Sequence, residues 1–133
     1  MRIDHIMLRT TDLEKSEHFY TEVMGMKIIA WDNRMDSPDN RYNSFFAAYE
    51  ETGAKMEIVY NDGKDDPDIY QNGNVVGHVG IYVEDIIKIQ ANAITHGFHF
   101  ERIVTHKNGN KEYKIGTIKG PEGVNLALVQ KIS

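Results

Sequence analysis

The chain has no cysteine among its 133 residues, so it can form neither disulfides nor thiolate metal sites. Any bound metal ion must therefore have nitrogen and oxygen ligands. No run of Lys and Arg is present and the net charge is −5, which argues against a nucleic-acid partner. The sequence has no apolar run of about 18 residues and no recognisable signal peptide. We expect a cytoplasmic protein with no membrane partner.

What the chain does contain is the composition of an ordinary globular protein. Hydrophobic residues make up 41% and charged residues 26%, a balance that supports independent folding. A chain of 133 residues is long enough for one substantial core but too short for two independent ones. We expect a single domain over residues 1–133, in which any internal duplication shares one core.

The order of predicted elements occurs twice along the chain. Each copy has a strand, a helix that begins at an aspartate cap and ends at a glycine, and three further strands. In the first copy the predicted strands are 2–8, 27–31, 44–49 and 55–60, with a helix from 13 to Gly25 and a polar loop over 32–43. In the second copy they are 75–83, 98–104, 113–118 and 125–129, with a helix over 86–96 that ends at Gly97. The sequence predicts an α+β fold of two paired βαβββ modules, about 1–62 and about 74–133.

Two histidines occupy matching places in this repeat. His5 precedes the cap residue Asp12 by seven positions, and His78 precedes the cap residue Asp85 by the same number. The histidines are therefore expected at equivalent positions in the two halves. Each copy alone would leave one face of its sheet uncovered, and pairing the two modules would cover that face in each.

Strand alternation predicts which side chains share a face. Side chains alternate between the two faces of a strand, so His5 and Arg9 point the same way, as do Glu57 and Asn61. By the same parity Asp4 is expected on the face opposite His5. A carboxylate between Met56 and Ile58 is costly to bury unless it is paired with a charge or bound to a metal.

These observations leave two interpretations open. A lone histidine in a strand is more often a packing residue than a ligand, and Glu57 could instead form a salt bridge with Arg9 or Lys55. The matched pair of histidines favours the second interpretation, in which His5, Glu57 and His78 bind one divalent ion. Two imidazoles and a carboxylate are a ligand set suited to Zn, Ni, Co, Mn or Fe(II).

Several short segments, spread over nearly the whole chain, carry a family pattern. They are Asp4–Arg9, Ser16–Met26, Met56–Asn61, Gly77–Gly80 and Gly120–Gly123. They resemble glyoxalase I (lactoylglutathione lyase) and the wider vicinal oxygen chelate superfamily, which includes bleomycin-resistance proteins and extradiol dioxygenases. The resemblance implies that the two modules form a curved mixed sheet around a metal-binding cleft.

The resemblance also assigns roles to particular residues. It implies that His5, Glu57 and His78 bind the metal ion, with Zn, Ni or Co as the expected metal. Glu57 is implied as the catalytic carboxylate. Arg9 and Asn61 are implied to bind the glutamyl end of glutathione, or part of another thiol cosubstrate.

One position departs from the family. Alignment of the turn Gly120–Gly123 and the following strand places Ala127 where the family has a fourth ligand, a glutamate. The internal repeat agrees, because Met56–Val59 matches Leu126–Val129 and makes Ala127 the counterpart of Glu57. Glu122 lies five residues earlier, in a turn, and is not expected to replace that ligand.

The resemblance implies a metal-dependent lyase or isomerase that acts on a thiohemiacetal of methylglyoxal or a related small carbonyl compound. It also implies a homodimer, and exposed sheet faces make association physically sensible. The alanine leaves three alternatives open: a binding or sequestration protein of the bleomycin-resistance kind, a superfamily enzyme with another substrate, or a site completed by Glu101, His106 or Glu112.

Overall fold

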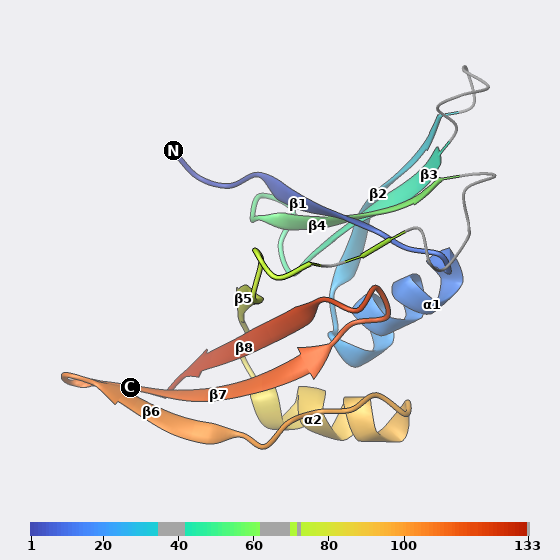
Figure 1. Cartoon of the computed structure of the whole chain (residues 1–133). Coiled ribbons are helices and arrows are strands. Elements are labelled where there is room, and N and C mark those ends of the chain that lie inside the picture. The colour runs from blue at the N-terminus through green and yellow to red at the C-terminus, as the bar shows by residue number, and fades with distance from the viewer. Residues whose placement is uncertain (35–41, 62–69, 72, 133) are drawn as a thin grey trace. The chain divides into compact units, whose positions relative to one another are not determined.

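The computed structural model describes residues 1–34, 42–61, 70–71 and 73–132. The chain divides into two compact units, Met1–Gln71 and Asn72–Ser133. Each unit contains strand, helix and three strands in that order (Figure 1), which confirms the predicted α+β fold of two βαβββ modules. Each module forms its own four-stranded mixed sheet. The expectation that both modules make one domain stays a prediction.

The first unit orders its strands β1-β4-β3-β2. β1 runs parallel to β4, and the remaining neighbours are antiparallel. The elements are β1 (His5–Arg9), α1 (Leu13–His18), the π-helical segment η1 (Phe19–Val23), β2 (Lys27–Arg34), β3 (Tyr42–Ala48) and β4 (Lys55–Asn61).

The helical segment of the first unit begins and ends as its sequence predicts. The Asp12 carboxylate accepts a hydrogen bond from the Lys15 backbone N–H at 3.0 Å, which caps the helix start. Gly25 adopts a φ of +74°, a conformation that favours glycine and ends the segment. Tyr20 is fully buried and its ring lies 6.4 Å from that of Phe45 on β3, so aromatic packing anchors the segment to the sheet.

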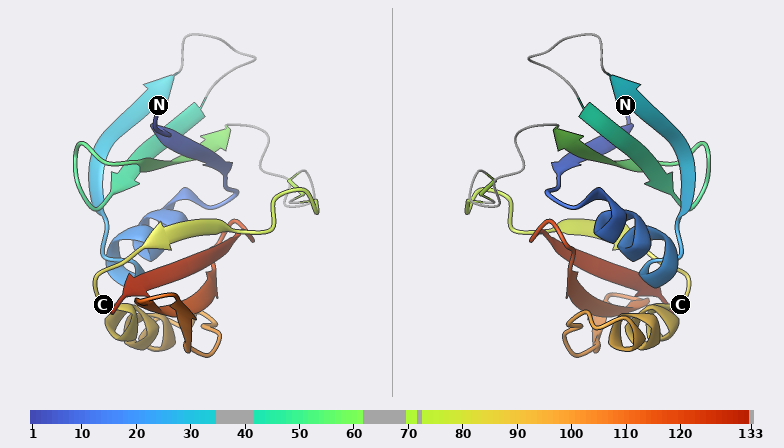
Figure 2. Two further views of the ribbon diagram at one scale, coloured as in Figure 1. Left: turned by 90° about the vertical axis from the view of Figure 1, so that its left-hand side faces the viewer. Right: turned by 90° about the vertical axis from the view of Figure 1, so that its right-hand side faces the viewer.

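The second unit repeats this plan with strand order β5-β8-β7-β6. The Asp85 carboxylate caps the helix by accepting from the Lys88 N–H at 3.1 Å. The helix lies along β7 and β8 on one side of the sheet (Figure 2). The elements are β5 (Val79–Tyr82), α2 (Ile86–Thr95), β6 (Val104–Asn108), β7 (Lys111–Lys119) and β8 (Asn125–Lys131).

The first strand of each unit is shorter than predicted. β1 begins at His5 and not at residue 2, and β5 begins at Val79 and not at residue 75. His78 therefore lies directly before its strand, and strand parity does not fix the direction of its side chain. Both strands start where residue pairing with the neighbouring parallel strand begins.

The predicted strand over 98–104 is wrong. Over 98–103 only Phe100 forms a bridge, to Ile118, and the strand begins instead at Val104 as β6 (Val104–Asn108). The residues of β6 are exposed and, apart from Val104, polar, so the apolar pattern gave no indication of them. Gly109, at a φ of +62°, supplies the turn of the β6–β7 hairpin, and pairing across this turn sets the register.

The polar loop predicted over 32–43 is partly strand. β2 extends to Arg34 and β3 begins at Tyr42, while residues 35–41 lie outside the described residues. The strands continue because they pair with each other as an antiparallel hairpin. Among the residues that the structure describes, no helix is long and apolar enough to cross a membrane.

Candidate metal centre

The first sheet gathers the candidate residues of its unit on one face. Met7 pairs with Glu57 across β1 and β4, and residues in register on neighbouring strands share a face. His5, two residues before Met7, therefore lies on the face of Glu57, as does Arg9, two residues after it. The predicted parity of these side chains is confirmed.

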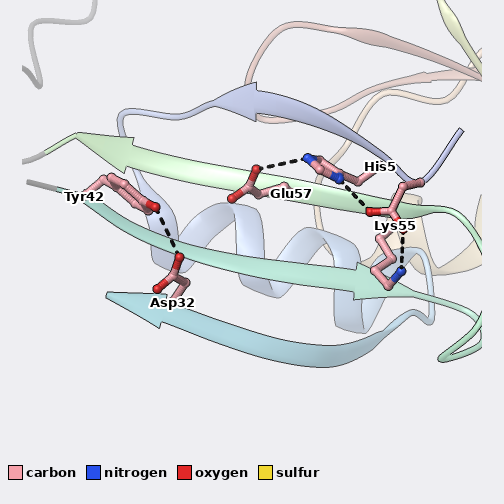
Figure 3. Close-up of polar contacts among 6 residues, drawn as sticks. His5, Asp32, Tyr42, Lys55 and Glu57 are labelled. Atoms are coloured by element: carbon pink, nitrogen blue, oxygen red, sulfur yellow. Dashed lines mark hydrogen bonds and ion pairs between the residues drawn. The ribbon is translucent and has the colours of Figure 1, made fainter. Parts of the chain in front are cut away.

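His5 and Glu57 face each other directly (Figure 3). The His5 Nε2 and Glu57 Oε1 atoms are 3.6 Å apart, with the imidazole 40% and the carboxylate side chain 15% exposed. The rings of His5 and of Phe46 on β3 form a T-shaped pair, with ring centres 5.5 Å apart and planes at 82°. The imidazole thus packs against an aromatic ring and keeps one nitrogen toward a partly buried carboxylate.

The separation of these two atoms fits a shared divalent ion. Metal–nitrogen and metal–oxygen bonds of about 2.0 to 2.2 Å, at angles of about 90° to 120°, hold two ligand atoms about 3.0 to 3.6 Å apart. The observed 3.6 Å is at the upper end of this range and exceeds an ordinary hydrogen bond. Nitrogen and carboxylate oxygen also match the predicted ligand chemistry.

The alternative salt bridges of Glu57 are not formed among the described residues. Lys55, which pairs with His5 in the strand register, instead reaches the Asp4 carboxylate, at 3.5 Å between Nζ and Oδ1. Arg9 is exposed and forms no ion pair within the described part of the chain. The partner of Glu57 is His5.

His78 belongs to the second unit, where it lies exposed directly before β5. The structure thus brings together two of the three predicted ligands, His5 and Glu57. No group of three His, Asp or Glu side chains placed to bind one ion occurs in the described ranges. The participation of His78 stays a prediction.

The residues predicted to bind a thiol cosubstrate lie on adjacent strands. Arg9 ends β1 and Asn61 ends β4, and both follow the alternation that starts at His5 and Glu57. The Tyr70 hydroxyl lies 3.5 Å from the Asn61 side-chain oxygen, a long hydrogen bond. The role of Arg9 and Asn61 in binding a thiol cosubstrate stays a prediction.

Ala127 occupies the place in the second sheet that the repeat predicts. Gly80 on β5 pairs with Ala127 on β8, as Met7 on β1 pairs with Glu57 on β4. Ala127 is buried, with 8% of its surface exposed. Glu122 lies in the turn before β8 and not on the strand.

Of the residues considered as replacement carboxylates or imidazoles, the register favours Glu101. Its backbone N–H donates to the Thr117 carbonyl at 2.9 Å, and Thr117 pairs with Ala127, so Glu101 shares the face of Ala127 two strands away. His106 lies on this face near the end of the sheet, and Glu112 lies on the opposite face.

Asp4 is a site residue that sequence reasoning missed. Its Oδ2 atom lies 2.8 Å from His5 Nδ1, because Asp4 precedes β1 and strand parity does not apply to it. This hydrogen bond, together with the charge of Lys55, lowers the pKa of the Asp4 carboxyl. An acidic residue directly before a candidate ligand was the available signal.

The sequence matches the Glyoxalase/Bleomycin resistance protein/Dioxygenase superfamily over residues 2–128. It is 36% identical to a probable lactoylglutathione lyase of Vibrio cholerae, over 97% of this chain and 90% of that protein. It is 30% identical to the lactoylglutathione lyase of Haemophilus influenzae, over 100% of this chain and 95% of that protein.

The structure of this chain is similar to the solved structures of two glyoxalases. A trypanothione-dependent glyoxalase I of Leishmania major has a TM-score of 0.72 and 27% identity, over 98% of this chain and 86% of that chain. Glyoxalase I of Zea mays has a TM-score of 0.81 and 27% identity, over 99% of this chain but 45% of that chain. The protein belongs to the Glyoxalase/Bleomycin resistance protein/Dioxygenase superfamily.

Proposed function

We propose that the protein is a metal-dependent lyase of the glyoxalase I kind, which isomerises a thiohemiacetal of methylglyoxal or a related small carbonyl compound to a thioester. The observation that carries this proposal is the 3.6 Å separation of His5 Nε2 and Glu57 Oε1 on one sheet face. Relatives at 30% and 36% identity that are named lactoylglutathione lyases support the same reaction.

His5, Glu57 and His78 would hold one divalent ion, with Zn, Ni or Co preferred for this ligand set. When bound, such an ion supplies positive charge that stabilises the anion formed after proton removal. His78 joins this set by its place in the repeat.

Glu57 would transfer the proton of the reaction. Its carboxylate accepts the proton from the carbon that bears the hydroxyl and the sulfur, and returns it to the neighbouring carbonyl carbon. The substrate hydroxyl becomes the thioester carbonyl and the former carbonyl becomes a hydroxyl, so no oxidant or reductant is needed. Partial burial of Glu57 limits competition from water.

Arg9 and Asn61 would bind the thiol part of the substrate. The guanidinium of Arg9 suits a carboxylate group, and the Asn61 amide offers both a donor and an acceptor. Glutathione carries such a carboxylate, and other acidic thiols share this chemistry.

The experiment is a titration of metal-stripped protein with Zn, Ni or Co, followed by an assay of methylglyoxal with glutathione and with other thiols. Thioester formation that depends on the added ion is expected, with loss in His5→Ala, Glu57→Gln and His78→Ala. Glu50→Gln removes an exposed carboxylate from the turn before β4 and serves as the control. The proposal fails if no ion binds stoichiometrically or if no thiol supports turnover.

A second function is favoured by Ala127, which leaves the second sheet without a carboxylate at the position that mirrors Glu57. A binding protein of the bleomycin-resistance kind needs no such carboxylate. Tight binding of a drug-like compound to metal-free protein would support it.

A third alternative is that Glu101 completes the metal site in place of a carboxylate at residue 127. Glu101→Gln, tested in the metal titration, would show whether Glu101 contributes to metal affinity.

The predicted homodimer and the cytoplasmic location both stay predictions. The mass in solution, measured by light scattering, would test the dimer. Mixing His5→Ala and His78→Ala chains then asks whether one site takes ligands from two chains. Recovered activity in the mixture would show a shared site.

A further inference from the structure

The His5 imidazole is held from both of its nitrogen atoms. Its Nδ1 atom lies 2.8 Å from Asp4 Oδ2, a short hydrogen bond to a carboxylate. Its Nε2 atom points toward Glu57 Oε1, 3.6 Å away. Because Nδ1 meets an acceptor, it must carry the ring proton, and the neutral ring then has its lone pair on Nε2.

The Asp4 carboxylate is itself held in place by β4. Its second oxygen, Oδ1, lies 3.5 Å from the Lys55 ammonium, and the Lys55 backbone N–H donates to the Asp4 carbonyl at 3.0 Å. Lys55 is also the residue that pairs with His5 in the strand register. Asp4 therefore contacts the residue beside His5 on the next strand as well as His5 itself.

The distance on the Nε2 side is informative. At 3.6 Å the two atoms are farther apart than in a hydrogen bond, so Nε2 does not donate to Glu57. In the neutral ring, the nitrogen lone pair and the carboxylate oxygen that face each other at this distance repel unless a proton or a metal ion lies between them. The orientation set by Asp4 is the one that a shared ion requires.

We propose that Asp4 is a positioning residue, which fixes the tautomer and ring orientation of His5 so that Nε2 and Glu57 present their lone pairs to one divalent ion. This proposal rests on the proposed function, because it assumes that His5 and Glu57 bind that ion. Carboxylate partners of metal-binding histidines raise ligand basicity and restrict the ring. The residue before His78 is Gly77, so the second histidine has no equivalent preceding carboxylate.

The test compares Asp4→Asn with the wild-type protein and with Glu50→Gln, which removes one negative charge from the same unit. Long-range nitrogen–proton NMR of the metal-free proteins should find His5 protonated at Nδ1 in wild type and in Glu50→Gln. Asp4→Asn should instead show a substantial population protonated at Nε2. Circular dichroism before and after heating would confirm that each variant is folded.

The same proteins are then titrated with Zn or Co. Calorimetry, or for Co the visible absorption bands, measures the metal affinity. Affinity should fall about 10- to 100-fold in Asp4→Asn and remain unchanged in Glu50→Gln. Unchanged tautomer and affinity in Asp4→Asn, with metal-binding wild-type protein, would overturn the positioning role and leave the proposed function standing. Absence of metal binding in wild type would overturn both.

Discussion

Ala127 stands in the second sheet where Glu57 stands in the first. The strand registers establish this equivalence, since Gly80 pairs with Ala127 as Met7 pairs with Glu57. The two halves of the chain therefore offer unequal chemistry, with a carboxylate on one side of the repeat and a methyl group on the other. A single substitution, Ala127→Glu, would place a carboxylate at this position in both halves.

We predict that Ala127→Glu raises both metal affinity and lyase activity. A positioned general base contributes about 10²- to 10⁴-fold, so a gain in kcat of at least about 100-fold is expected. A carboxylate at this buried position destabilises the metal-free protein. Binding of an ion to the carboxylate offsets that destabilisation. Melting temperatures with and without Ni or Zn should therefore diverge more in the variant than in wild type.

Ala127→Gln is the matched control, because it adds similar volume without the charge. It should lose stability and gain no activity. Equal metal affinity in wild type and Ala127→Glu would contradict a ligand position at residue 127.

The proposed role of Arg9 predicts how activity depends on the charge of the thiol. Arg9→Met should lower kcat/KM for glutathione by about 10- to 100-fold, since a hydrogen bond to a charged group contributes about 1.5 to 3 kcal/mol. Steady-state assays with an uncharged thiol provide the comparison, and there Arg9→Met should have little effect. A loss of the same size with both thiols would assign Arg9 a structural role.

The face that His5 shares with Arg9, and the face that Glu57 shares with Asn61, could be predicted from the sequence, because these residues lie in strands and side chains alternate along each strand. Asp4 was assigned to the opposite face, yet its carboxylate contacts His5. The rule failed there because β1 begins at His5, directly after Asp4, and not at residue 2 as predicted. Strand ends are set by pairing with a neighbour, which a single strand's pattern does not contain.

β6 shows the same limit at larger scale. Its exposed and mostly polar residues carry no alternation, and the turn at Gly109 places them in register with β7. His78 lies just before a strand and in the other unit, so spacing along the chain could give its place in the repeat but not its distance from Glu57. Repeat and parity thus predicted which residues hold matching places in the two halves, but not the distances between them.

The helix caps are matched between the two units and give a stability prediction. Asp12→Ala and Asp85→Ala should each lower the free energy of unfolding by about 0.5 to 2 kcal/mol, because each removes the acceptor for a helix N–H. Asn caps helices about as well as Asp, so Asp12→Asn and Asp85→Asn should cost much less. Urea denaturation followed by circular dichroism measures these differences, and equal losses for Ala and Asn would show that charge matters more than the cap.

Tyr49 should make the free energy of unfolding fall at alkaline pH. Its hydroxyl donates to the Met24 carbonyl at 2.8 Å, and burial raises the pKa of the phenol above its ordinary value. In the unfolded chain the phenol loses its proton near pH 10, about the ordinary value, while the folded protein still retains it. The unfolded state then binds fewer protons, so this contribution is fully present below about pH 10 and is lost as pH rises further, by up to about 1.4 kcal/mol per pH unit.

Tyr49→Phe should therefore cost about 0.5 to 1.5 kcal/mol at neutral pH through the lost hydrogen bond, and should lose stability less steeply above about pH 10. Urea unfolding at about pH 8 and about pH 11 tests this, with the exposed Tyr82→Phe as the control. The stability difference between wild type and Tyr49→Phe should shrink or reverse at the higher pH, whereas that between wild type and Tyr82→Phe should change little. A constant difference for Tyr49→Phe would mean that the buried phenol loses its proton as readily as it does in the unfolded chain.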